Sequence, residues 1–116
     1  MGALVILPFL TWVAAAQPVE RIICPEGPYH IAPFSLSVDD SVRTLETSGV
    51  AAEPETVKIT HATVEFSFMR GWAVFHRDTR VLEWDATAQY DHNSAIGYPG
   101  PHPRAWYAGT ARCEVK

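Results

Sequence analysis

The stretch from Thr56 to Ala86 constrains the fold most strongly, because apolar and polar residues alternate along most of it. Val64, Phe66 and Phe68 fall at every second position, with polar residues between them. This period of two is typical of a β-strand with one buried face and one face in water. We therefore expect an antiparallel β protein whose sheet is built around this stretch.

Changes in the alternation divide this stretch into strands. The apolar residues fall at odd positions before His61 and at even positions after it, so one extra residue would restore a common face. We interpret this change of phase as a β-bulge near His61–Ala62. Turns are expected at Met69–Gly71, because glycine adopts a positive φ cheaply, and at the polar run Arg77–Arg80. Three consecutive strands of a meander follow from this division.

Shorter alternating runs flank the central stretch. Val19–Cys24 and Phe34–Val42 are predicted strands, and Arg104–Lys116 is predicted to be the closing strand. Ser48–Glu55 reads as a loop, whereas Asp40–Leu45 fits either a strand or a helical turn. The predicted fold class is all-β: a small antiparallel barrel or sandwich of about six strands.

The first sixteen residues predict export. Residues 1–16 are mostly apolar and carry no charged side chain, and they end in three alanines before Gln17 and Pro18, which is typical of a secretory signal peptide. The run is too short to cross about 30 Å of hydrocarbon as a helix. We expect cleavage after Ala16, leaving residues 17–116 as a single domain. A retained anchor and a first element of the fold are the alternatives.

Two cysteines, Cys24 and Cys113, lie near the two ends of the expected mature chain. An oxidising compartment would join them, and two cysteines allow one pairing within the chain. The expected disulfide closes the domain and adds at most roughly 4 to 5 kcal/mol to the free energy of unfolding. The alternative is a pair of buried thiols.

The charge pattern argues against two classes of partner. The chain has a net charge of −4, and its arginines are scattered along the sequence, so no basic patch for nucleic acid is expected. No amphipathic helix is predicted after residue 16, so we expect no stable membrane insertion after signal cleavage.

The segment Thr87–Pro103 is rich in glycine, proline, tyrosine and histidine, and we predict a long loop without regular structure. Such loops often carry function. The expected ligand-binding surface comprises Tyr90, His92, Tyr98, His102, Arg104 and Trp106. Tyrosine, tryptophan and arginine are common interface anchors. The alternative for Trp72, Trp84 and Trp106 is a place in the core, on three predicted strands.

The chain contains histidines and aspartates that could serve in catalysis, but their spacing matches no recognised active-site motif. His76 and Asp78 would share a strand face, but an aspartate in a turn usually bonds its own backbone. Asp91 and His92, with His102 farther along the same loop, form the best candidate for a metal site. The sequence does not place three ligands at known positions, as such a site would require. We therefore predict no metal, no cofactor and no catalytic residue, and we lean against an enzyme.

Four features together resemble a group of short exported proteobacterial proteins of unknown function. They are Cys24, the strand Val64–Phe68, the hairpin Phe75–Leu82 with its arginine-containing turn, and the terminal Gly109–Cys113. The resemblance covers most of residues 17–116 and implies no activity.

We predict a periplasmic or secreted binding domain of the bacterial envelope, whose partner is an unknown envelope protein or glycan. The alternatives are a small metal-dependent hydrolase and a purely structural envelope component.

Overall fold

A computed structural model describes residues 19–116 of the chain. Within that range, nine strands form two antiparallel sheets, so the all-β prediction is confirmed, although the expected number of strands was about six. The predicted signal peptide, residues 1–16, lies outside the described residues.

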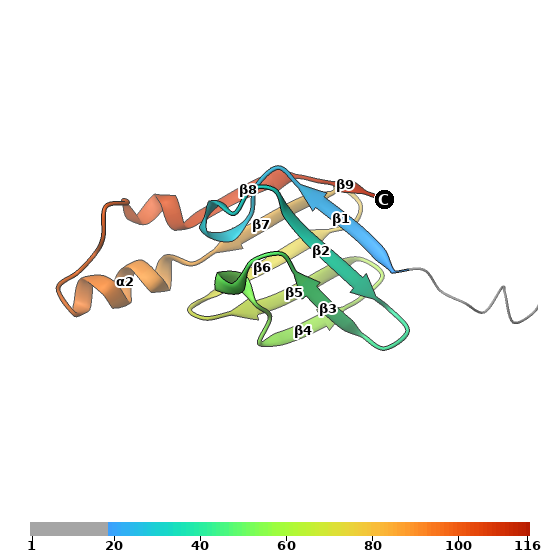
Figure 1. The fold of residues 1–116 in the computed structure, drawn as a ribbon, viewed down its shortest axis with the longest axis horizontal. Coiled ribbons are helices and arrows are strands. Elements are labelled where there is room, and N and C mark those ends of the chain that lie inside the picture. Colours follow the sequence, from blue (N-terminus) through green and yellow to red (C-terminus); the bar gives the residue numbers. More distant parts are fainter. Residues whose placement is uncertain (1–18) are drawn as a thin grey trace, which may run out of the picture.

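The four-stranded sheet has the order β3-β2-β1-β9, and the five-stranded sheet has the order β4-β5-β6-β7-β8 (Figure 1). The strands of the first sheet are β1 (Glu20–Cys24), β2 (Phe34–Asp39), β3 (Thr44–Thr47) and β9 (Glu114–Val115). Those of the second are β4 (Thr56–Ile59), β5 (Thr63–Phe68), β6 (Gly71–His76), β7 (Val81–Asp85) and β8 (Ala108–Arg112). The helices are α2 (Thr87–Ala95) and the 3-10 helices η1 (Pro28–His30), η2 (Val50–Ala52) and η3 (Arg104–Tyr107).

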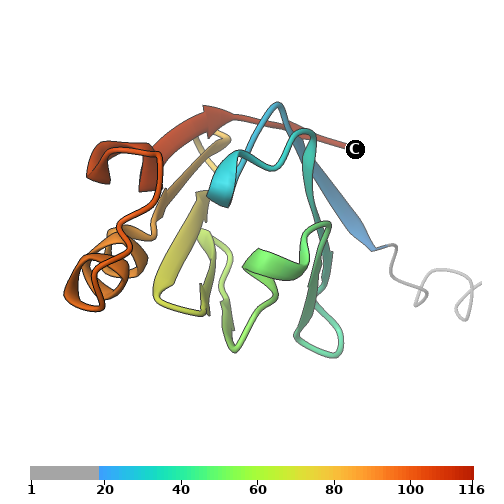
Figure 2. The same cartoon turned by 60° about the vertical axis from the view of Figure 1, so that its left-hand side comes forward.

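One hydrophobic core lies between the two sheets. Phe34, Leu36 and Val38 of β2 belong to the same buried cluster as Phe66 of β5 and Phe75 of β6. Alternate residues of β2, β5 and β6 are buried, as the period of two predicts. The sheets face each other as separate layers and do not close into a barrel (Figure 2). The fold is therefore the sandwich form of the prediction.

The disulfide predicted from the sequence is present and joins the two sheets. Cys113 separates β8 of one sheet from β9 of the other, and its sulfur bonds Cys24 at the end of β1. The two cysteines are 89 residues apart and both are buried. A second link comes from Arg77, whose guanidinium bonds Glu20 of β1 and, at 3.0 Å, the carbonyl of Thr60 beyond β4.

The predicted β-bulge at His61–Ala62 is wrong, because the chain turns there. Strands β4 and β5 form a hairpin in which Ile59 pairs with Val64. The hydroxyl of Thr60 accepts hydrogen bonds from the backbone N–H groups of Ala62 (3.2 Å) and Thr63 (2.9 Å). A turn changes the phase of the alternation as a bulge would, since each strand then starts its own count.

The next two turns lie where the sequence predicts them, but arginines take the positive φ. In the turn Met69–Gly71 it is Arg70 that has φ 56°, whereas Gly71 begins β6. Gly71 is required for a different reason: a Cβ there would lie 2.9 Å from the Asp85 carbonyl oxygen. Arg80 has φ 60° in the turn that joins β6 and β7. The meander therefore has four consecutive strands, β4 to β7, and not three.

The predictions for the first half of the domain are largely confirmed. Val19–Cys24 contains β1, and Phe34–Val42 contains β2. The ambiguous segment Asp40–Leu45 is a turn that leads into β3. Ser48–Glu55 is a connection, interrupted by η2.

The predicted long loop Thr87–Pro103 is wrong, because its first half is helix α2. The predicted closing strand starts late, since Arg104–Tyr107 is η3 and β8 begins at Ala108. Trp106 therefore does not lie on a strand. We call residues 87–107 the arm; it runs from α2 to η3 and extends beyond one end of the sandwich (Figure 1).

Candidate functional site

Tyrosines anchor the arm on the sandwich. Tyr107 is buried, and its ring meets Tyr29 of η1 edge to face at 6.2 Å and Tyr90 of α2 at 5.9 Å between centroids. The backbone N–H of Ala86 donates to the carbonyl of Tyr107 at 2.8 Å, which closes the base of the arm. Burial raises the pKa of Tyr29, with a further rise from Tyr107, so its phenol stays neutral.

Trp106 is the centre of an aromatic group that joins the arm to η1. Its indole stacks on His102 with a centroid distance of 3.9 Å and an interplanar angle of 4°. The ring of His30 lies 4.5 Å from the same indole, tilted by 30°. Two of the predicted site residues, His102 and Trp106, are therefore in contact, and η1 contributes a third ring.

His30 is held by two hydrogen-bond acceptors. Its Nε2 lies 3.0 Å from the carbonyl oxygen of Trp106, and its Nδ1 lies 3.1 Å from Glu26 Oε2. The two contacts fix the orientation of the ring between the carboxylate and the carbonyl. Tyr29 and His30 also have φ of 59° and 55°, a left-handed conformation that costs about 1 to 3 kcal/mol for such residues. The chain is thus strained where it supports the arm.

Arg104 connects the two halves of the arm. Its Nε and Nη2 donate to the two carboxylate oxygens of Asp91 at 2.9 and 3.2 Å, in the bidentate geometry that arginine favours. This hydrogen bond lowers the pKa of Asp91 and raises the pKa of Arg104. Arg104 is exposed, so a partner could still meet the face of its guanidinium.

His92 and Tyr98 differ in how they are held. Arg70 Nη2 lies 3.3 Å from His92 Nε2, and since arginine only donates, that nitrogen accepts. The backbone of Tyr98 is fixed by a 2.8 Å hydrogen bond to the carbonyl of Asn93, but its side chain is 79% exposed. Ile96, two residues earlier, is 58% exposed. Ile96 and Tyr98 are the two exposed large hydrophobic residues of the arm, and we call them its apolar tip.

The six predicted residues all lie in the arm, on α2, on η3 and on the connection between them, and they have different roles. Tyr90 packs at the base, Arg104 and His92 are hydrogen-bonded, and His102 stacks on Trp106. Sequence reasoning missed His30, which lies 76 residues from Trp106. Gly27 and Pro28, just before His30, indicate a turn in the sequence. They do not indicate that the turn contacts the arm.

The residues weighed for catalysis are engaged in structural contacts. Among residues 19–116, no three histidine, cysteine, aspartate or glutamate side chains are grouped to hold a metal ion. His76 Nε2 lies 2.7 Å from Glu83 Oε1, so its ring contacts a carboxylate other than that of Asp78. Asp78 accepts from the backbone N–H of Thr79 at 2.8 Å, as expected for a turn aspartate. In the same part of the chain, no helix has the length and apolar character needed to cross a bilayer.

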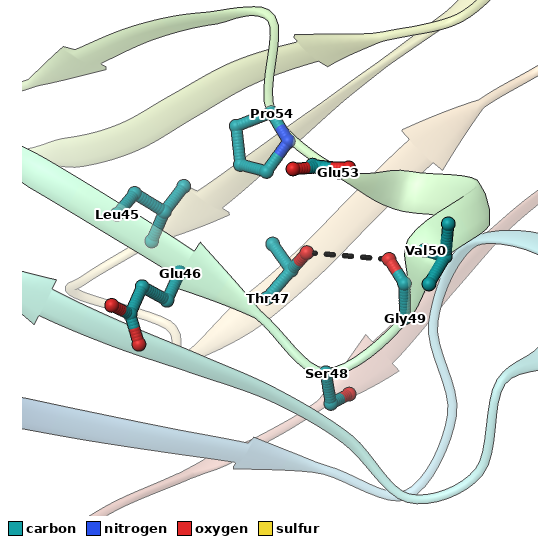
Figure 3. A pocket seen from close by; sticks show the side chains of 8 residues that line it. All are labelled: Leu45, Glu46, Thr47, Ser48, Gly49, Val50, Glu53 and Pro54. Carbon is teal, nitrogen blue, oxygen red and sulfur yellow. Dashed lines mark hydrogen bonds between the residues drawn. The ribbon is translucent and has the colours of Figure 1, made fainter.

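A pocket of about 410 Å³ lies between the end of β3 and η2 (Figure 3). The hydroxyl of Thr47 donates to the carbonyl of Gly49 at 3.5 Å and to that of Ala52 at 3.2 Å, so it holds the connection in place. Figure 3 shows the carboxylates of Glu46 and Glu53 on opposite sides of Thr47, without a common point toward which they turn. The pocket is therefore a weaker candidate than the arm.

Comparisons of the chain with protein-family models, with curated proteins and with solved structures found no match.

Proposed function

We propose that the protein is an exported binding domain, and that the arm recognises a partner protein of the bacterial envelope. The observation that carries the proposal is the apolar tip, where Tyr98 is 79% and Ile96 58% exposed at the end of an arm fixed in place. Aromatic residues are enriched at protein interfaces, and a few such anchors supply most of the binding free energy.

The arm is pre-organised for binding because three sets of contacts fix it. They are the backbone hydrogen bond between Ala86 and Tyr107, the bidentate pair of Arg104 with Asp91, and the contacts of Trp106 with η1. Side chains on a fixed support lose less conformational entropy when a partner binds, so each contact contributes more to affinity.

Export is supported by two features of the chain. The buried disulfide between Cys24 and Cys113 fits an oxidising compartment such as the periplasm or the cell exterior. The apolar residues 1–16 have the pattern of a secretory signal peptide.

Capture from envelope extract by the immobilised, oxidised protein tests this proposal. Tyr98→Ala should lower capture of the partner about tenfold or more, the loss expected of an interface anchor, and should leave the melting temperature unchanged because the side chain is exposed. The matched control is Val50→Ala in η2, where the side chain is 89% exposed but lies outside the arm.

The two variants give opposite expectations. Val50→Ala should capture the partner as the unmodified protein does. Equal capture by Tyr98→Ala and the unmodified protein would refute the arm as the binding surface.

A further inference from the structure

Trp72 is an exposed tryptophan on the outer face of the five-stranded sheet. It lies on the central strand β6, where its neighbours Ala73 and Phe75 point into the core. Its own side chain is 45% exposed. Trp84 on the adjacent strand shows the contrasting case, since it is buried. The indole of Trp72 therefore contributes little to the core for a residue of its size.

Two hollows adjoin this indole. One, of about 380 Å³, is lined by residues of β4, β5 and β6, among them Thr56, Ser67 and Trp72. The other, of about 300 Å³, lies toward α2 and is lined by Trp72 together with Asp85 and Thr87. Trp72 is thus a wall shared by two adjoining depressions on one face of the molecule.

Polar side chains follow the same line across the strands. The pairing register places Thr56 opposite Ser67, Ser67 opposite Trp72, and Trp72 opposite Asp85. The described hydrogen bonds of Asp85 come from the N–H (2.8 Å) and hydroxyl (2.6 Å) of Thr87, and both use Oδ1, which leaves Oδ2 free to accept from a ligand.

Carboxylates outnumber cations beside this line. Glu65 and Glu83 lie in the next row, on either side of Val74, and Asp85 lies on the line itself. The cations are Lys58, opposite Glu65, and Arg70, in the wall of the second hollow. A ligand with phosphate, sulfate or carboxylate groups would meet Glu65, Glu83 and Asp85, and like charges at short range are unfavourable. The face therefore favours a ligand without negative charge.

We propose that this face binds a neutral oligosaccharide, with one pyranose ring stacked on Trp72 and the neighbouring sugars in the two hollows. The face of an indole carries negative partial charge, so it attracts the C–H groups on the flat side of a sugar ring. Sugar hydroxyls donate to carboxylate oxygens and exchange hydrogen bonds with threonine and serine hydroxyls. An aromatic platform with a few polar groups is the usual composition of a small-ligand site.

A peptide strand fits this face less well. Strand addition requires a sheet edge with unpaired backbone groups, whereas β6 is paired on one side with β5 and on the other with β7. A ligand above Trp72 can be held only by side chains. The site includes only Thr87 and Ala88, at the start of the arm, and excludes its apolar tip, so it does not depend on the proposed function.

Titration of the oxidised, isotope-labelled protein with N-acetylchitotetraose and with cellotetraose tests the proposal by NMR. Either sugar should shift the indole N–H signal of Trp72 and the amide signals of Ser67 and Asp85, with a Kd of about 1 mM. A hyaluronan tetrasaccharide, which carries carboxylates, should shift them at least about threefold less at equal concentration.

Three variants locate the effect. Trp72→Ala should weaken binding about tenfold or more, and Trp72→Phe, which keeps a flat ring, should stay within about threefold of the unmodified protein. Val42→Ala, an exposed change in the turn between β2 and β3, should bind as the unmodified protein does.

Several results would overturn the proposal. One is the absence of any shift with either neutral sugar at about 10 mM, roughly tenfold above the expected Kd. The others are undiminished binding by Trp72→Ala and stronger binding of the anionic sugar than of the neutral ones. The shift of the Trp72 indole N–H signal is measured on the unmodified protein, so a loss of fold in Trp72→Ala would not obscure the answer.

Discussion

At the residue scale, side chains that reach across between elements decide how the arm is held. His30 is a clear example, because its two ring nitrogens bridge Glu26 and the backbone of Trp106, and its ring lies against the indole at a tilt of 30°. Its left-handed backbone, like that of Tyr29, has a conformational cost that the contacts of the arm must offset. Strain of this kind is often found near functional sites, in agreement with a role for the arm in binding.

Close packing at Gly109 leads to a first prediction. A Cβ at this position would lie 2.6 Å from Cζ2 of Trp84, whose side chain is 2% exposed and has little room to move. Gly109→Ala should therefore lower the free energy of unfolding by about 1 to 3 kcal/mol, the usual cost of overpacking. Denaturant unfolding measures it, with the exposed neighbour Thr110→Ala as control. Equal stability of Gly109→Ala and the unmodified protein would contradict the packing described.

The pair of Asp91 and Arg104 leads to a second prediction. Because the hydrogen bond from Arg104 lowers the pKa of Asp91, Arg104→Ala should raise that pKa toward its ordinary value. The pair stabilises the folded protein above the pKa of an unfolded aspartate, and this contribution is lost as the pH falls through the lower folded pKa. NMR titration of the carboxyl groups measures the change.

Asp39 provides an internal control for that titration. Its pKa is also lowered, but by the hydroxyl of Ser41, so Arg104→Ala should leave it unchanged. A low pKa of Asp91 that persists in Arg104→Ala would contradict the assignment of the cause.

At the scale of elements, α2 depends on its surroundings. It has nine residues, none of them buried, and helices of this length are marginal in isolation. The carboxylate of Asp85 bonds the backbone N–H of Thr87 in its first turn, and Arg104 of η3 holds its middle at Asp91. The helix therefore forms through its neighbours more than through an apolar face of its own.

This dependence predicts fast hydrogen exchange in α2. Its amides should exchange about a hundredfold or more faster than those of Ala73 and Phe75 in β6, which lie in the middle of the sheet with buried side chains. Hydrogen–deuterium exchange followed by NMR measures both sets in one sample. Protection of α2 equal to that of β6 would contradict this account.

The same dependence explains which elements were predictable from the sequence. In β2 and β5, apolar residues such as Leu36 and Phe66 alternate with polar ones because one face of each strand is buried. Both strands form where this alternation predicts them. In α2 no apolar period exists to be read, and the nearby glycines and prolines suggested a loop. At His61 a turn and a bulge change the phase alike, so the pattern alone could not separate them.

At the scale of the whole molecule, the disulfide joins the two sheets at the point where the chain crosses between them. Reduction should lower the free energy of unfolding by up to about 5 kcal/mol, because a loop closed over 89 residues strongly restricts the unfolded chain. Denaturant unfolding of the same protein with and without reductant measures this loss and introduces no mutational cavity. Equal midpoints under both conditions would contradict a stabilising role.

The candidate site illustrates the limit of sequence reasoning at this scale. The tyrosines, histidines and Trp106 of the arm stand out because they cluster within a short stretch of the chain. The contribution of η1 does not, because only the folded sandwich brings His30 beside Trp106. The outer face around Trp72 is likewise assembled from four strands, and the register between them is a property of the fold.

The most direct test of the central claim is to compare capture of the envelope partner by the oxidised protein with capture by a variant in which Tyr90–His102 is replaced by a glycine-serine linker. The sandwich should remain folded by near-ultraviolet circular dichroism, because the disulfide and both sheets lie outside the replaced segment. We predict that the unmodified protein captures one partner and that the folded variant does not. Capture by both proteins, or by neither, would contradict a binding function located in the arm.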